Sequence, residues 1–243
     1  ETGTRAALYG GTTMVIDFIL QKQGHSLREA FDEWSGRATG NAVGDYSFHM
    51  AVTDFNDETK KEIQHFIENE GITSFKTFMA YKGALMIDDR QMVGLMQEVK
   101  KHGGLINVHA TNGDMIDYLI AKHKAEGKLS PLYHYLSQPE VTEAEASSRF
   151  ADMADYTGCP GYIVHLTCEG ALNAVRFATR RVSLAGRCTA SRALASGPIR
   201  SRRCAYVQPT FSLRRSSASR LPRPAPTRPR PLPARTPSSA TRL

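Results

Sequence analysis

Several features that mark membrane, secreted or disulfide-bonded proteins are missing from this sequence of 243 residues. No apolar run approaches the roughly 18 to 20 residues that a membrane-spanning helix needs, and the opening residues ETGTR do not resemble a secretory leader. The four cysteines form no CxxC pair and are too sparse for a disulfide scaffold, so we expect reduced thiols and no structural zinc knuckle. We therefore expect a globular protein of the cytoplasm without a membrane partner.

The last 62 residues, 182–243, lack lysine, aspartate and glutamate, yet they hold 13 arginines and nine of the 12 prolines. The remaining residues, 1–181, carry 18 basic and 24 acidic side chains, so the net charge of +7 belongs to the tail alone. With no apolar periodicity, the tail is expected to be disordered. Arginine-rich tails can bind nucleic acid, and an ordinary disordered tail is another alternative. We favour a third interpretation, GC-rich DNA translated out of frame, and do not expect a nucleic-acid partner.

Residues 1–181 alternate β-branched, apolar segments with amphipathic ones, which predicts repeated βα units around a parallel sheet. The expected strands are 12–18, 45–52, a segment within 71–83, 105–110 and 162–166. The expected helices are 4–9, 26–34, 58–69 with Asp57 as its N-cap, 88–102, 112–126, 142–156 and 169–180. The residues around Pro131 and Pro139 are expected to form a loop.

Five such units suit either a (β/α)8 barrel or a doubly wound sheet. No glycine-rich phosphate loop follows any expected strand, so the dinucleotide-binding fingerprint is missing. Lys76, His109 and His165 fall near the C-terminal ends of three successive strands, where barrel active sites are assembled. We therefore predict an α/β fold, a partial (β/α)8 TIM-type barrel of about five βα units in residues 1–181.

Lys76 lies in the middle of the apolar segment GITSFKTFMAYKG. Burying an ammonium is costly unless it is paired, and we expect no partner from the residues around it, Phe75, Phe78, Met79 and Ala80. Burial also lowers the pKa of a lysine. A neutral amine can react with carbon dioxide to give a carbamate, an anionic ligand that can bridge two metal ions.

His109 and His165, each taken alone, would read as core histidines with a hydrogen-bond partner. Together with Lys76 they lie on successive strands at the expected barrel mouth, and imidazole is the commonest metal ligand in proteins. The three residues therefore predict a metal site. By contrast, Asn112 and Asp114 are expected to shape a turn and cap the next helix.

Four motifs make the first 181 residues resemble the dihydropyrimidinase and hydantoinase family of cyclic-amide hydrolases: GTRAALYGGTTMVIDF, SFKTFMAYKG, VHATNGD and YIVHLTCEGALNAVR. The resemblance implies two zinc ions bridged by a carboxylated Lys76 and bound by His109 and His165. It implies that Tyr81 contacts the substrate carbonyl and stabilises its negative charge while a metal-activated hydroxide opens the C–N bond. The implied substrates are small cyclic amides or ureides of pyrimidine degradation, and the implied assembly is a homotetramer.

The sequence also departs from that family. No HxH pair occurs anywhere, Thr111 replaces a glutamate in the VHATNGD motif, and the tail offers no late aspartate. We therefore expect an incomplete barrel that hydrolyses weakly or not at all and is prone to aggregate through open sheet edges. The alternatives are an allantoinase-like hydrolase, which Tyr81 argues against, and a non-catalytic adaptor, which the presence of Lys76, His109 and His165 argues against.

Overall fold

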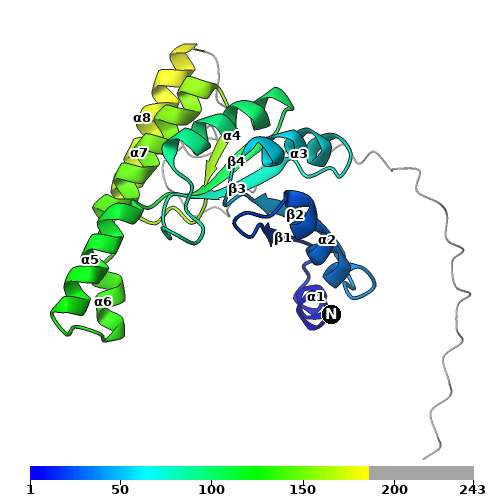
Figure 1. Ribbon diagram of the computed structural model, residues 1–243, viewed down its shortest axis with the longest axis horizontal. Helices are drawn as coiled ribbons and strands as arrows, with labels where there is room; N and C mark the ends of the chain where they lie inside the picture. The colour runs from blue at the N-terminus through cyan, green and yellow to red at the C-terminus, as the bar shows by residue number, and fades with distance from the viewer. Residues whose placement is uncertain (186–243) are drawn as a thin grey trace, which may run out of the picture. The chain divides into compact units, whose positions relative to one another are not determined.

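A parallel sheet of five strands organises the protein in the computed structural model, which describes residues 1–185 (Figure 1). The strands pair in the order in which they occur in the chain, β1-β2-β3-β4-β5. Their bounds are β1 Met14–Leu20, β2 Asp45–Ala51, β3 Ser74–Phe78, β4 Leu105–His109 and β5 Gly161–Ile163. We expect tail disorder from residue 182, whereas the last described helix continues to Ala185. The expectations for 186–243 lie outside the described residues.

Helices follow the strands as the periodicity predicts. Their bounds are α1 Thr2–Tyr9, α2 Leu27–Ala38, α3 Asp57–Glu68, α4 Asp89–Lys101, α5 Gly113–Ala125, α6 Pro131–Leu136, α7 Glu140–Thr157 and α8 Glu169–Ala185. None of the helices within 1–185 combines the length and the hydropathy of a membrane-spanning segment.

The strand order identifies the sheet as part of a (β/α) barrel. A doubly wound sheet reverses its strand order at a switch point, whereas here every strand pairs with the next one in the chain. Right-handed crossovers then bring the connecting helices to one face of the sheet. In agreement, α2 contacts β1, α4 contacts β4 and α7 contacts β5, and α3 and α4 lie together beside the strands in Figure 1. The predicted fold is confirmed.

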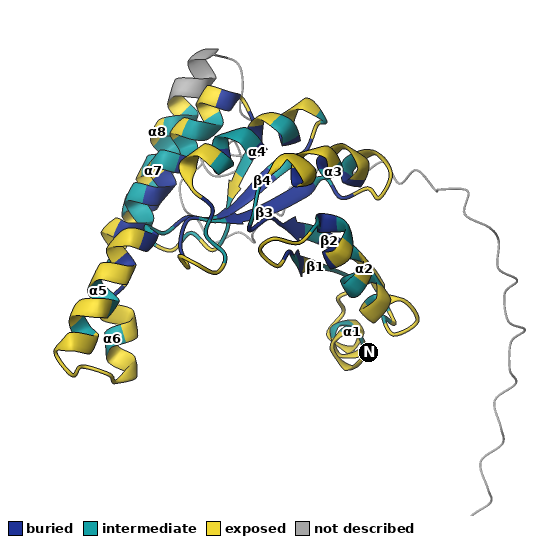
Figure 2. Cartoon of the chain, viewed as in Figure 1, coloured by how far each residue is buried: buried dark blue, intermediate teal, exposed yellow. Residues whose placement is uncertain are grey.

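The core lies between the helices and one face of the sheet, where the strands are dark blue in Figure 2. Met50, Phe75 and Ile106 from three neighbouring strands are fully buried, in one cluster with Phe66 of α3 and Leu95 of α4. Side chains alternate between the two faces of a sheet along each strand. The strand residues next to Met50, Phe75 and Ile106 therefore point to the opposite face. We call it the inner face, and it carries His49, Ser74, Lys76, Phe78, Asn107 and His109.

Three sequence predictions about local structure are wrong. Asn56, not Asp57, caps α3, because its side chain accepts hydrogen bonds from the backbone N–H groups of Glu58 and Thr59 at 3.0 Å each. The expected loop at Pro131 contains the short helix α6, which proline begins because its missing N–H has no partner in a first turn. Finally, β5 ends at Ile163.

The early end of β5 places His165 in the loop that follows it. His165 has a φ of 40°, in the left-handed region that a β-strand cannot contain. Of the cysteines, Cys159 and Cys168 are free thiols as expected, whereas Cys188 and Cys204 lie outside the described residues.

Candidate active site

Lys76 sits in the middle of β3 with only 4% of its surface exposed. Its Nζ has no hydrogen-bond partner among the described residues. The expectation that Phe78 provides no partner for Lys76 is wrong, because Nζ lies 4.8 Å from the centroid of the Phe78 ring, within cation–π range. Burial lowers the pKa of Lys76 to about 7, so a large fraction of the amine is neutral at physiological pH.

His109 ends β4 and meets His165 across the loops that follow β4 and β5. His109 Nδ1 lies 2.9 Å from His165 Nε2, and Thr111 Oγ1 lies 2.9 Å from the other ring nitrogen, His109 Nε2. Burial, and secondarily the charges of His165 and Lys76, lowers the pKa of His109 to about 4. The His109 imidazole is therefore neutral at pH 7, the form in which histidine binds metals.

Tyr81 stands beside this histidine pair in the loop after β3. Its ring centroid is 5.0 Å from that of His109 and 6.0 Å from that of Phe78, while 51% of the residue is exposed. Its φ of 66° is strained for a bulky residue and costs about 1 to 3 kcal/mol. Its carbonyl accepts 3.0 Å hydrogen bonds from Ala84 N and Leu85 N, which fix this conformation.

The donors present here fit part of a metal site. Within residues 1–185 no group of three or more histidine, cysteine, aspartate or glutamate side chains is placed to hold an ion. The His109 and His165 rings meet, however, and the buried amine of Lys76 lies close enough to lower the pKa of His109. A carbamate on that amine would supply the anionic oxygens that this histidine pair lacks.

Sequence reasoning missed a polar cluster deeper on the inner face. His49 of β2 shares its Nδ1 with Ser74 Oγ of β3 and with Asn107 Nδ2 of β4, the latter at 3.3 Å. The ring of Phe18 lies against the His49 ring, with centroids 5.0 Å apart. A histidine in the middle of an apolar strand gives no sign of such partners, which only the strand register reveals.

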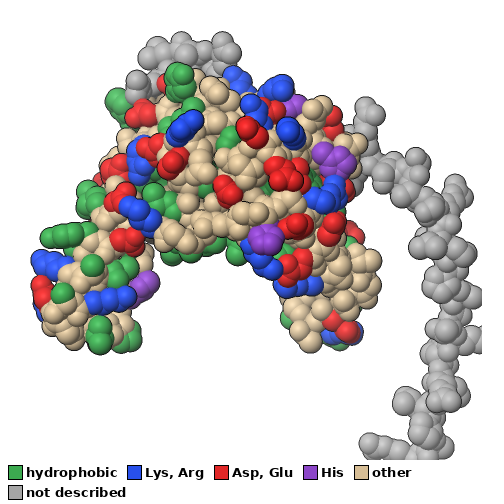
Figure 3. Space-filling view, viewed as in Figure 1, with side chains coloured by type: hydrophobic (Ala, Val, Ile, Leu, Met, Phe, Trp, Pro, Cys, Tyr) green, Lys and Arg blue, Asp and Glu red, His purple; other side chains and the backbone are tan. Residues whose placement is uncertain are grey.

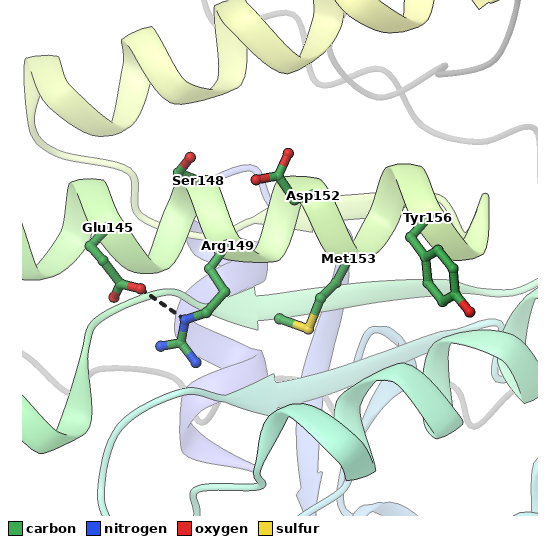
Figure 4. Close-up of a pocket in the computed structure, with 6 residues that line it drawn as sticks. All are labelled: Glu145, Ser148, Arg149, Asp152, Met153 and Tyr156. Atoms are coloured by element: carbon green, nitrogen blue, oxygen red, sulfur yellow. Dashed lines mark hydrogen bonds and ion pairs between the residues drawn. The ribbon is translucent and has the colours of Figure 1, made fainter.

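A second missed network joins the loops that carry the site. Asn112 caps α5 and donates to Glu145 of α7 at 2.6 Å, and Glu145 pairs with Arg149 at 2.9 Å. Arg149 then pairs at 2.5 Å with Asp89, the first residue of α4. Figure 4 shows Glu145 and Arg149 in the pocket along α7 that they line with Ser148, Asp152, Met153 and Tyr156. This pocket belongs to the helix surface and contains none of the predicted site residues.

Asn112 caps α5 as predicted, whereas Asp114 lies inside the helix. The Asn112 side chain accepts from Met115 N at 3.0 Å, and Asp114 in the first turn of α5 forms an ion pair with Lys82, next to Tyr81. Cys168 interacts with backbone groups of Glu140 and Ala171, and burial is the main cause that raises the pKa of its thiol, which lowers the fraction of reactive thiolate.

Comparison with known proteins assigns the chain to a family. The sequence profile described as the amidohydrolase family matches residues 1–204. The chain belongs to the amidohydrolase family. The match continues past residue 181, where we expect the domain to end.

Within this amidohydrolase family, individual relatives are similar to the chain over most of its length. It is 47% identical over 172 residues to the D-hydantoinase of Streptomyces coelicolor, covering 71% of this chain and 37% of the relative. It is 43% identical over 178 residues to the dihydropyrimidinase of Rattus norvegicus, covering 73% and 34%.

A solved D-hydantoinase structure matches the fold with a TM-score of 0.73 at 46% identity, covering 78% of this chain and 40% of that one. The chain therefore spans well under half the length of these relatives.

Proposed function

We propose that this chain provides part of the active site of an enzyme that hydrolyses the cyclic amide of a dihydropyrimidine or a hydantoin. The products would be N-carbamoyl β-amino acids or α-amino acids, respectively. The observation that carries the proposal is the buried, unpaired amine of Lys76 near the His109–His165 pair. The relatives described above carry the names of hydantoinases and dihydropyrimidinases, so we prefer these rings to allantoin.

His109, His165 and a carboxylated Lys76 would hold the zinc of such a site, two ions in the complete enzyme. Zinc lowers the pKa of water and polarises a carbonyl. Burial keeps His109 neutral and able to donate a lone pair, since its pKa is about 4. The described residues supply only this share of the ligands.

The Tyr81 hydroxyl acts on the substrate. Its ring is next to His109 and half of the residue is exposed, so its phenol can reach a ring bound over the histidines. As the amide carbonyl becomes tetrahedral, its oxygen gains negative charge and accepts a hydrogen bond from the phenol. The backbone conformation of Tyr81, which the hydrogen bonds to its carbonyl hold, fixes where this side chain leaves the loop.

The decisive experiment is a chimera in which residues 1–181 replace the matching part of a full-length D-hydantoinase. With zinc bound, it should open hydantoin or dihydrouracil, and Tyr81→Phe should lower kcat about 100-fold by removing the oxyanion donor. Tyr9→Phe, on the exposed end of α1, is the matched control and should leave kcat unchanged. A folded, zinc-loaded chimera without turnover would overturn the proposal.

The 243-residue chain alone should hydrolyse these rings weakly or not at all, because its described residues hold only part of the ligand set. The measurement is ring opening of both substrates with added zinc. Turnover near that of a full-length relative would contradict this expectation.

We also propose a cytoplasmic location and a homo-oligomer. Exposed apolar side chains concentrate on α5, α6 and the loop between them, where Figure 3 shows hydrophobic atoms among charged ones. The most exposed within α5, α6 and this loop are Tyr118, Leu129, Leu132 and Tyr135. Exposed apolar surface of this kind marks interaction sites.

A further inference from the structure

The His49, Ser74 and Asn107 cluster lies directly beside Lys76 on the inner face. In the strand register Lys76 pairs with Ala51 of β2 and with Asn107 of β4. Ser74 and His49 are each two positions earlier on their strands and so point to the same side. The cluster thus forms the floor beneath the amine, and Ser74 and Asn107 are 7% and 6% exposed.

The hydrogen bonds of the cluster define its proton positions. An amide nitrogen can only donate, so the contact from Asn107 Nδ2 makes His49 Nδ1 an acceptor. The ring proton of neutral His49 therefore lies on Nε2. One hydrogen of the Asn107 amide remains for a further acceptor. Ser74 Oγ contacts the same acceptor nitrogen, so its one hydroxyl hydrogen is directed at His49. The floor contains no carboxylate, and its two remaining donors are His49 Nε2 and the second hydrogen of the Asn107 amide.

None of the contacts described above uses these two remaining donors of the floor. Lys76 is itself a donor and has no anion or hydrogen-bond acceptor among the described residues. Hydrogen-bond donors cannot satisfy an amine that is itself a donor. They can, however, stabilise an anion formed on that amine.

We propose that His49, Ser74 and Asn107 are positioning residues that stabilise a carbamate formed between Lys76 Nζ and carbon dioxide. The inference rests on the role proposed for Lys76 above. The Nζ lone pair attacks the carbon, a C–N bond forms, one C–O π pair moves to oxygen, and the displaced N–H proton passes to water. The carbamate oxygens then accept hydrogen bonds from His49 Nε2 and Asn107 Nδ2, while the Ser74 hydroxyl holds the His49 ring in place.

Carbamate formation can be followed on the full chain without metal. Carbon-13 NMR in ¹³C-bicarbonate should show a carbamate signal that is absent from Lys76→Gln, which separates Lys76 from surface lysines. Asn107→Leu keeps the side-chain volume but removes the donor. The bicarbonate concentration for half occupancy should rise at least about 10-fold, the factor for one hydrogen bond to a charged group. Ser74→Ala removes the hydroxyl that holds the His49 ring in place and should raise it about 3-fold.

Ser147→Ala is the matched control for Ser74→Ala, because Ser147 is a fully buried serine of α7 whose Oγ has no hydrogen-bond partner among the described residues. It should alter thermal stability but leave carbamate occupancy unchanged. The proposal is overturned if no Lys76 carbamate forms, or if folded Asn107→Leu and Ser74→Ala keep the wild-type half-occupancy. A chimera that carries the carbamate but fails to open either ring would instead refute the proposed function alone.

Discussion

At the scale of single residues, Lys76 lies against an aromatic ring but has no anionic partner among the described residues. Burial lowers its pKa from 10.5 to about 7, so between these pH values the folded protein binds fewer protons than the unfolded chain. Stability therefore rises with pH across this interval. Below about pH 7 both states are protonated, and the full cost of the buried charge is present.

Lys76→Met should accordingly raise the free energy of unfolding at pH 6 by about 1 to 3 kcal/mol, and this gain should nearly vanish by pH 10. Urea unfolding at both pH values, in buffer free of carbon dioxide, measures it. Lys82→Met is the control: Lys82 is exposed and paired with Asp114, so its removal should give no gain at pH 6. An equal gain from Lys76→Met at both pH values would refute burial of a charge as the cause.

His109 should titrate with a midpoint near pH 4 in NMR spectra of its imidazole. Burial is the main cause, and the charge of His165 adds to it, so His165→Asn should move the midpoint upward. Because the unfolded chain protonates first, His109 makes the fold less stable as pH falls from about 6.5 towards 4. His25→Asn, on an exposed side chain, should leave the His109 midpoint unchanged.

The sequence identifies Lys76 and His109 because a charged or polar residue in an apolar run is visible without coordinates. The side chains that contact these two residues cannot be predicted from the sequence. The contact of Lys76 with Phe78 depends on side-chain alternation along β3, and the link of His49 to Asn107 spans 58 positions. Such contacts arise from register, which hydrophobic patterns specify only to the level of which face is buried.

At the scale of elements, the start of α5 is packed against the loop after β3. Gly113 N donates to Met79 O at 3.1 Å, and a Cβ on Gly113 would lie 3.0 Å from Ala80 Cα and from Met79 O. Gly113→Ala must therefore push apart the two segments that carry Tyr81 and His109. Only glycine permits this approach.

Gly113→Ala should lower the free energy of unfolding by about 1 to 3 kcal/mol. Gly36→Ala is the matched control, since Gly36 lies within α2 with no atom within 4 Å of a new Cβ. It should stabilise the protein by about 0.5 to 1 kcal/mol through helix propensity. Thermal or urea unfolding would contradict the packing argument if both variants shifted stability in the same direction.

The type and order of the strands and of the longer helices were predictable, because periodicity over ten or more residues outweighs local ambiguity. The ends of the strands and helices were harder to predict. YIVHL continues as an apolar run past Ile163, yet the strand stops there and His165 turns into a left-handed conformation. Asn56 and Asp57 are both good caps, and only the backbone geometry decides between them.

At the scale of the whole molecule, the sheet has two open edges among the described residues. There β1 pairs only with β2, and β5 pairs only with β4. The β1 edge is more prone than the β5 edge to pair with another chain, because β1 is seven residues long and exposes Met14 and Phe18.

The chain should therefore associate in a concentration-dependent way, and Phe18→Lys should reduce this association by placing a charge on the edge strand. Sedimentation velocity at several concentrations measures it. Tyr135→Lys tests α6 as the contact instead: if it dissociates the protein while Phe18→Lys does not, the association runs through the α5–α6 surface.

The order of the strands also bears on how the protein is made. Because each strand pairs with the one synthesised just before it, every new βα unit needs only an edge that already exists. Contacts of short sequence separation close at low entropic cost. The barrel wall can thus grow one unit at a time while the chain emerges from the ribosome, and each finished unit serves as the template for the next.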